Sequence, residues 1–505
     1  MKNIEKISSS SQILENIKSF LDKNIGSNTE NQGSDGNLYT LAVQAYIYAF
    51  PWLYLSQLRW LWTSDAGKTI QEAQSGQAIS APINSFWYAP ELASSGSTTG
   101  GSPNTDTLYS IAWCDLSEEP LVLSVPEVTD RYYSIVLCGI DSDTFGYVGS
   151  RATGTASGNY LLVGPNWNGS IDKYNEGKDE SEMILDILPR SYYDSILLLG
   201  RTGTTTGTKV DIDKALNIQS QYKLTPLSDW VSGTSNSDAP KAMLPIGLSY
   251  DNTKGAWYTI NQAMTECPPG VYPSIPQEQL VQLFATIGIG PNQELKTQSA
   301  ENLAVLQKAA QDGLQILKKA SGNSGKNVNG WTYPPTYYGK AGQMGDYLTR
   351  ASLQALAGIT ANWTVEAVYL NTYVDSEGQS LSGSQNYVIQ FTEDSFPPFE
   401  SEYFGFWSIT MYNNSYQLVP DSVAYTVNSN NLQYQGRDSN GGMTILIQQA
   451  DPGELPEGTY WLQSPTASED NDYNDEFFLV LRDYVPAPEV STTQTWNPPS
   501  LNRMD

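Results

Sequence analysis

Short strand-like segments constrain the fold of this chain most strongly. Short runs rich in apolar, β-branched and aromatic residues lie at 108–113, 121–125, 132–138, 145–148, 160–163 and 195–199. Gly, Pro, Asn and Asp separate these runs, and helical patterns do not intervene between them. Such spacing is typical of an antiparallel sandwich or barrel, because parallel strands need long crossover connections.

Alternation of apolar and polar residues marks further strand-like segments in the second half of the sequence. It covers residues 387–391, 406–412, 443–448 and 477–482. Helical periodicity occupies 277–288, 299–320 and about 343–370 instead. We therefore predict a mainly β chain of the α+β class, with two antiparallel β-sandwich or jelly-roll-like domains joined by a helical region. The predicted parts are a flexible tether (1–36), an N-terminal sandwich with a leading helix (37–235), a mainly helical connecting region (236–370) and a C-terminal sandwich (371–505).

Charge and hydropathy exclude several kinds of partner. The 505 residues carry a net charge of −27, which repels phosphate backbones and argues against nucleic acid as a partner. No apolar run reaches the roughly 18 residues that a membrane span needs, and residues 1–36 lack the apolar core of a signal peptide. We expect a soluble protein that is made in the cytoplasm, without membrane insertion, and that is open to incorporation into a particle or surface assembly.

The chain contains no histidine. Ser-His-Asp and Cys-His catalysis are therefore excluded, and so is the commonest zinc ligand. The three cysteines are widely spaced and are expected to be small buried hydrophobes. A bridge between Cys114 and Cys138 is left open.

A catalytic site would have to use carboxylates, Tyr, Lys or Arg. The segment 103–110 combines turn formers with a strand pattern, and it holds Asp106 where a loop enters a sheet. Asp106 can meet acidic and basic residues of neighbouring strands, and the catalytic candidates are Asp106, Asp141, Arg151 and Arg201. The alternative is structural, with Asp106 capping a turn and the arginines anchoring loops by ion pairs.

An acidic run near the C-terminus is the one candidate metal site. Asp470, Asp472 and Asn474 place oxygen ligands at alternate positions, as a calcium loop does. The run lacks the glycine at the sixth position and has Leu481 where a bidentate glutamate belongs. Ca²⁺ and a solvated acidic loop are the two interpretations, and no other cofactor is predicted.

Aromatic residues in a loop-like setting are the candidate contact for a ligand or another subunit. The segment 331–338 is rich in Pro, Trp and Tyr, and its rings are hard to bury completely. The candidates are Trp331, Tyr333, Tyr337 and Tyr338. Such rings stack on sugars or pack at a subunit boundary.

Several blocks of the sequence resemble a known two-part family. Residues 103–110, 115–116, 151–154, 163–165 and 199–202 resemble the domain-of-unknown-function family 1254, and residues 329–331, 346–351, 406–412 and 482–486 resemble its companion family 1214. The resemblance implies two β-sandwich-like domains joined by helices, frequent oligomers and no established reaction. The chain departs from the family at 460–465, where Tyr-Trp-Leu-Gln-Ser-Pro replaces an Asn-Trp-Leu-Pro-Ala-Pro-like block.

These observations favour a binding or structural role. We expect a self-associating homo-oligomer that serves as a structural or surface scaffold, such as a virion component, and presents a face for ligands such as glycans. The alternative is a hydrolase that works without histidine, through carboxylates or a metal. Whether the chain is an enzyme stays open at this stage.

Overall fold

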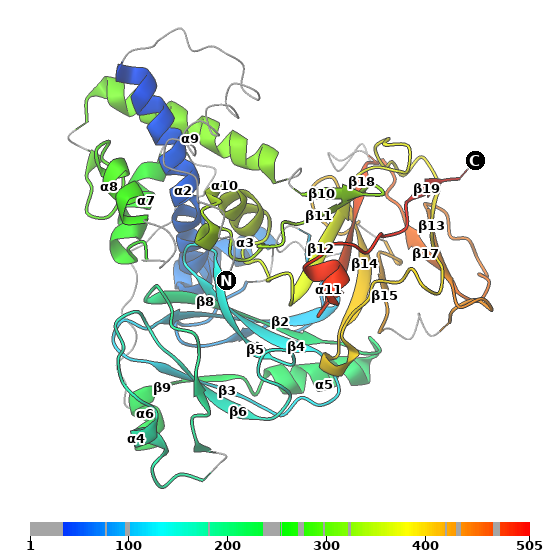
Figure 1. Ribbon diagram of the computed structural model, residues 1–505, viewed down its shortest axis with the longest axis horizontal. Coiled ribbons are helices and arrows are strands. Elements are labelled where there is room, and N and C mark those ends of the chain that lie inside the picture. Colours follow the sequence, from blue (N-terminus) through cyan, green and yellow to red (C-terminus); the bar gives the residue numbers. More distant parts are fainter. Residues whose placement is uncertain are drawn as a thin grey trace.

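The computed structural model confirms a sheet-rich α+β chain (Figure 1). It describes residues 34–75, 78–95, 102–179, 182–235, 253, 255–270, 277–295, 298–321, 325–419, 422–430, 436–467 and 475–504. The predicted N-terminal strand runs all appear as strands, because their alternating residues bury one or both faces of a sheet.

Two stacked sheets form the N-terminal sandwich. Sheet 1 has the order β1-β2-β8-β4-β5 and sheet 2 the order β7-β6-β3-β9. The strands of sheet 1 are β1 (Trp87–Tyr88), β2 (Thr107–Asp115), β4 (Tyr133–Gly139), β5 (Thr144–Gly149) and β8 (Ser195–Gly203). Those of sheet 2 are β3 (Leu121–Val125), β6 (Gly158–Leu162), β7 (Asp186–Ile187) and β9 (Lys223–Pro226). All pairs are antiparallel except β6 with β7, and Leu123, Ile135 and Leu198 are among the residues that pack between the sheets.

A helical layer covers part of the other face of sheet 1. The long helix α2 (Ser34–Thr63) buries its aromatic residues against Trp113, Val136 and Leu197 of that sheet. The other helices beside it are α3 (Asp65–Ser75), α7 (Ala256–Glu266), α8 (Gln277–Ala285), α9 (Ala300–Ala320), the short η3 (Gly342–Met344) and α10 (Tyr347–Thr349), and the π-helix η4 (Arg350–Ala357). Short helices elsewhere are α4 (Asp172–Asn175), α5 (Lys209–Gln219), α6 (Leu227–Ser232), η5 (Ser401–Tyr403) and α11 (Pro488–Ser491). No helix among the described residues has the length and hydropathy of a membrane span.

The C-terminal half is a second sandwich. Sheet 3 has the order β10-β11-β12-β18-β14-β15 and sheet 4 the order β17-β16-β13-β19. The strands of sheet 3 are β10 (Lys326–Val328), β11 (Trp331–Tyr333), β12 (Ala367–Thr372), β14 (Phe406–Asn413), β15 (Thr426–Asn428) and β18 (Phe477–Tyr484). Those of sheet 4 are β13 (Tyr387–Phe391), β16 (Met443–Gln448), β17 (Thr459–Gln463) and β19 (Asn502–Arg503). Val368, Ile389 and Ile445 pack between the two sheets.

The strands β10 and β11 lie inside the region 236–370, which we expected to be mainly helical. They form a hairpin, and Thr332 pairs with Asn371 of β12, so this segment belongs to sheet 3. Each strand is only three residues long. Such short strands carry too little alternation to be recognised in a sequence.

The outer face of sheet 3 meets the part of sheet 1 that α2 leaves uncovered (Figure 1). Tyr132, which precedes β4, packs against Phe406 and Tyr484 of sheet 3, with ring centroids 6.0 and 5.3 Å away. The polar residues Ser408 and Arg482 lie on the same face of sheet 3, opposite each other in the β14–β18 ladder. The two halves are therefore joined through a layer that mixes aromatic and charged side chains.

Candidate functional site

The structure does not gather the four catalytic candidates into one site. Asp106, Arg151 and Arg201 all lie in the layer between sheets 1 and 3, but each has different partners. Asp141 lies elsewhere, beneath α2 and the π-helix, beside Arg350. All of them except the partly exposed Arg151 are at least nine-tenths buried.

Asp106 connects the two halves of the chain. Its Oδ2 accepts a hydrogen bond from the hydroxyl of Ser408 at 2.6 Å, and its Oδ1 accepts one from the amide of Asn428 at 2.8 Å. Burial raises the pKa of Asp106, while the nearby Arg482 and these two hydrogen bonds act in the opposite direction. Both carboxylate oxygens accept hydrogen bonds, so Asp106 links the start of strand β2 to the C-terminal half.

Arg151 forms a second connection between the halves. Its Nε lies 2.5 Å from Oε2 of Glu366, and Oε1 of Glu366 accepts a hydrogen bond from the hydroxyl of Tyr132 at 2.8 Å. The guanidinium group also lies over the ring of Tyr147, 5.3 Å from its centroid. These contacts match the structural interpretation, in which arginines anchor loops by ion pairs.

Asp141 belongs to a sealed cluster with Asp143 and Arg350. Arg350 Nη1 lies 3.6 Å from Asp141 Oδ2, and its guanidinium group lies over the rings of Tyr48, Trp52 and Tyr347. Asp143 accepts hydrogen bonds from the backbone of Gly342 and Gln343 and from the amide of Gln354. Arg350 has no exposed surface, so the cluster holds α2, the β4–β5 turn and the π-helix together and offers no open site.

This cluster predicts a specific dependence of stability on pH. Burial, and then the neighbouring Asp141, raise the pKa of Asp143 to about 7 from an ordinary value of 3.8. The folded protein therefore keeps a proton between about pH 4 and pH 7 that the unfolded chain releases. This contribution to stability is complete below about pH 4 and is lost as the pH rises through about 7.

Asp143→Asn removes the carboxyl group that binds this proton. Urea unfolding between pH 4 and pH 8 measures the free energy of unfolding against pH. With rising pH, this free energy should fall less steeply in the variant than in the wild type, and the slopes should differ by up to about 1.4 kcal/mol per pH unit. Asp172→Asn, at an exposed position, is the control and should follow the wild-type curve. Parallel curves for Asp143→Asn and the wild type would contradict the shifted pKa.

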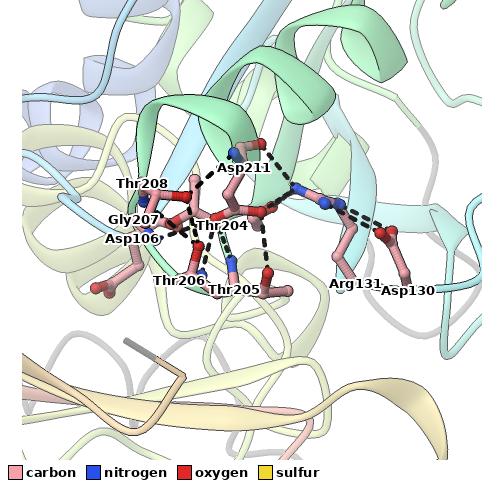
Figure 2. Close-up of polar contacts among 10 residues, drawn as sticks. Asp106, Asp130, Arg131, Thr204, Thr205, Thr206, Gly207, Thr208 and Asp211 are labelled. Atoms are coloured by element: carbon pink, nitrogen blue, oxygen red, sulfur yellow. Dashed lines mark hydrogen bonds and ion pairs between the residues drawn. The ribbon is translucent and has the colours of Figure 1, made fainter. Parts of the chain in front are cut away.

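The loop 204–208 wraps around the buried carboxylate of Asp211 (Figure 2). This loop forms one wall of the junction, the region where the two halves of the chain meet. Oδ2 of Asp211, in the first turn of α5, accepts hydrogen bonds from the backbone N–H groups of Thr205, Thr206 and Gly207 at 2.7 to 3.1 Å. Burial alone would raise the pKa of Asp211, but these bonds and the neighbouring Arg131 lower it. The carboxylate of Asp211 is therefore the anion that the N–H groups of this glycine- and threonine-rich loop bind.

Arg131 extends this wall toward the C-terminal half. Its Nη1 donates to Oδ1 of Asp211 at 2.9 Å, and its Nε donates to Oδ1 of Asp130 at 2.9 Å (Figure 2). The hydrogen bond from Arg131 holds the pKa of Asp130 below its ordinary value. Arg131 is 2% exposed, so two carboxylates fix its position inside the wall.

A cleft of about 410 Å³ lies between this wall and the C-terminal half. Asp130, Arg131 and Thr205 contribute to its N-terminal side. The other side carries rings together with polar groups, namely Phe396, Phe399, Phe404, Trp407, Ser401, Ser429, Asn430 and Arg437. Arg437 lies over the ring of Phe396, 4.2 Å from its centroid. The cleft thus sets flat apolar faces opposite fixed hydrogen-bonding groups.

A smaller cavity of about 200 Å³ borders the same loop. Asp106, Thr204, Thr205 and Asn428 are among the residues that line it, and Thr205 also lines the larger cleft. Asp106 is the one carboxylate among the described lining residues of this cavity, and Asp130 is the one among those of the larger cleft.

The aromatic segment 331–338 is only partly available at the surface. Trp331 and Tyr333 are 1% and 0% exposed, and they donate hydrogen bonds to the carbonyls of Pro499 and Trp496. The last segment of the chain covers both rings, so a ligand or subunit contact there does not include these two side chains. Tyr337 and Tyr338 are half-buried and bond to Asp346 and to the carbonyl of Leu353, and their contact role stays a prediction.

The calcium candidates Asp470, Asp472 and Asn474 lie outside the described residues. Within the part of the chain that is described, no group of three Asp, Glu or Cys side chains is arranged to hold a metal ion. The three cysteines are buried thiols without a disulfide, which answers the question left open for Cys114 and Cys138.

The sequence reasoning missed the residues of the cleft. Arg131 follows Asp130 in a turn before a strand, and nothing local distinguishes this pair from an exposed one. Asp211 did carry a signal, because Thr208 and Asp211 have the spacing of a helix-capping pair and the hydroxyl of Thr208 does cap α5. Of the segment 396–407, only residues 406 and 407 belonged to a predicted strand, and the rings before them were assigned no role.

Comparison with known families agrees with this architecture. Residues 83–226 match the family described as "Protein of unknown function (DUF1254)", and residues 366–488 match "Protein of unknown function (DUF1214)". The chain contains a DUF1254 region followed by a DUF1214 region. The DUF1254 match spans both sheets of the N-terminal sandwich, and the DUF1214 match contains most of the C-terminal one.

A solved structure shares the fold of this chain. The crystal structure of the VPA0106 protein from Vibrio parahaemolyticus aligns with a TM-score of 0.62 at 19% identity, and the alignment covers 93% of this chain and 100% of that one. An uncharacterised protein from Burkholderia cenocepacia aligns with a TM-score of 0.40 at 11% identity over 98% of both chains. No curated protein matches the chain. The first likeness establishes the fold and leaves the activity to be argued from the site.

Proposed function

We propose that this protein is a binding protein that holds a glycan in the cleft between its two halves. The observation that carries the proposal is the composition of the 410 Å³ cleft, where Phe399, Phe404 and other rings face the Asp130–Arg131 pair. Sugar rings stack on flat aromatic faces, while their hydroxyl groups need fixed donors and acceptors. Asp130 offers a half-exposed carboxylate to such hydroxyl groups, and its ion pair with Arg131 holds it in place.

The arrangement of carboxylates favours binding over hydrolysis. Glycoside hydrolysis commonly uses two carboxyl groups about 5 to 9.5 Å apart across the scissile bond. The described lining of the cleft offers Asp130 alone, and its ion pair with Arg131 lowers its pKa where a general acid needs a raised one. The cleft therefore has the groups for recognition without the pair for cleavage.

One observation keeps the hydrolase as a second candidate. Asp106 borders the 200 Å³ cavity, and burial raises its pKa, as a general acid requires. Its two oxygens are already bonded to Ser408 and Asn428, which argues for the structural role. A hydrolase would lose its activity in Asp106→Asn with the fold intact, whereas a binding protein would change only in stability or assembly.

A structural or surface scaffold role and self-association form the second part of the proposal. The half-buried rings of Tyr337 and Tyr338 are the candidate contact between copies. This part rests on the family resemblance and on the sequence analysis, and incorporation into a particle rests on the same ground.

A glycan array followed by calorimetry tests the ligand. The wild type should bind a subset of glycans, and Phe399→Ala should weaken that binding about tenfold, which corresponds to the loss of one stacking contact of about 1.4 kcal/mol. Tyr258→Ala is the matched control, because Tyr258 is an exposed ring on α7 that does not line the cleft. Absence of binding to every glycan, or equal affinities of Phe399→Ala and the wild type, would contradict the proposal.

A further inference from the structure

Two buried arginines stand on facing sheets in the junction layer. Arg201 is on β8 of sheet 1 and is 6% exposed, and Arg482 is on β18 of sheet 3 and is 3% exposed. Neither contributes to the lining of the glycan cleft. Their role is not explained by the proposed function.

Both guanidinium groups have an N–H donor without an acceptor among the described residues. Arg482 Nη2 donates to the carbonyl of Ser102 and to the hydroxyl of Tyr412, but its Nη1 has no hydrogen-bond partner among the described residues. Nη1 of Arg201 likewise has no partner, and no ion pair joins Arg201 to a carboxylate of the described residues. A buried charged donor without an acceptor is costly, so an acceptor is expected at this place.

The surroundings supply too little negative charge to balance both arginines. Burial alone would lower the pKa of Arg201, but the phenols of Tyr369, Tyr109, Tyr132 and Tyr484 hold it above its ordinary value. Asp106 acts on Arg482 in the same direction, but its oxygens already accept bonds from Ser408 and Asn428. The other carboxylate of the layer, Glu366, is paired with Arg151.

Each arginine lies beside a tyrosine of the neighbouring strand. Tyr109 lies opposite Arg201 in the β2–β8 ladder, and Tyr369 lies opposite Arg482 in the β12–β18 ladder. Tyr109 and Tyr484 influence the pKa of both arginines, and the guanidinium carbon of Arg201 is 5.8 Å from the ring centroid of Tyr109. Tyr109 and Tyr369 are partly exposed, so the layer reaches solvent on their side.

We propose that this layer is a binding site for a small oxyanion, a carboxylate or a phosphate group, held by Arg201 and Arg482. Guanidinium groups bind both kinds of oxyanion through paired N–H donors, and a dry site strengthens such bonds. The phenol of Tyr109 borders the site from sheet 1. Because sheets 1 and 3 each supply one arginine, a bound anion strengthens the contact between the two halves. This site is independent of the glycan cleft, and either can exist without the other.

Thermal unfolding with added salts tests the site in solution. Sodium phosphate and sodium acetate are compared with sodium chloride at equal ionic strength, and we expect a saturable rise in Tm with at least one of the two oxyanions. The larger rise distinguishes the phosphate class from the carboxylate class. Arg201→Gln should abolish the rise, and Arg503→Gln, at an exposed position on β19, should keep it. Equal effects of all three salts on the wild type would overturn the proposal.

A second measurement covers the case in which Arg201→Gln does not fold. Wild-type crystals grown without oxyanions are soaked in selenate, whose anomalous scattering marks its position. We expect a peak between the guanidinium groups of Arg201 and Arg482. Water alone at both Nη1 atoms in the soaked crystal would overturn the proposal.

Discussion

Replacement of Arg350 by methionine is expected to lower the free energy of unfolding by about 3–5 kcal/mol. Arg350 carries the positive charge that faces Asp141, and it donates a hydrogen bond to the backbone carbonyl of Tyr48 at 2.5 Å. Methionine fills part of the same space but leaves Asp141 buried without its counter-charge. Stability is measured by urea unfolding at pH 7.

Two further variants separate charge from packing at this cluster. Lys308→Met breaks the exposed ion pair with Asp312 on α9 and should cost about 0.5 kcal/mol or less. The double variant Arg350→Met with Asp141→Asn removes the charges of the Arg350–Asp141 pair and should recover much of the loss. If Arg350→Met were as stable as Lys308→Met, the cluster would not hold the helical layer on sheet 1.

Asp211→Ala is expected to cost about 3 kcal/mol and to weaken glycan binding as well. The carboxylate accepts hydrogen bonds from three successive backbone N–H groups and pairs with Arg131. Alanine leaves these buried donors unsatisfied, and each hydrogen bond to a charged group contributes about 1.5–3 kcal/mol without full additivity. Urea unfolding measures the loss, and calorimetry with the glycan selected on the array measures the change in affinity.

The neighbouring acid on the same helix provides the control. Asp213 is exposed and pairs with Lys209 one turn earlier, so Asp213→Ala should change stability by about 0.5 kcal/mol or less and leave binding intact. Asp211→Asn keeps one oxygen acceptor and should fall between the two alanine variants. Equal losses of unfolding free energy in Asp211→Ala and Asp213→Ala would contradict the claim that Asp211 holds the loop 204–208 in place.

The sandwiches could be predicted because their signal is local. Strands such as β4 and β18 bury every residue and contain the apolar runs 135–138 and 477–481, and β16 alternates buried with half-buried positions. The hairpin β10–β11 escaped prediction because its strands are three residues long. Pairing with distant β12 stabilises it, and local sequence does not encode such pairing.

The candidate site could be predicted only in part, because its contacts are long-range. Asp106 was recognised as a special acid, but its partners Ser408 and Asn428 lie more than 300 positions later in the chain. The burial of Trp331 depends in the same way on the carbonyl of Pro499 near the C-terminus. No spacing rule links such residues. The sequence could therefore single out Asp106 without revealing its hydrogen bonds to the C-terminal half.

A crystal structure of the wild type with the glycan selected on the array tests the central claim most directly. The account predicts an intact glycan in the cleft between the two halves, with a sugar ring against Phe399 and hydroxyl groups bonded to the carboxylate of Asp130. A glycan bound elsewhere with the cleft empty would contradict the proposed site. A cleaved glycan beside Asp106 would contradict the binding role and establish the hydrolase instead.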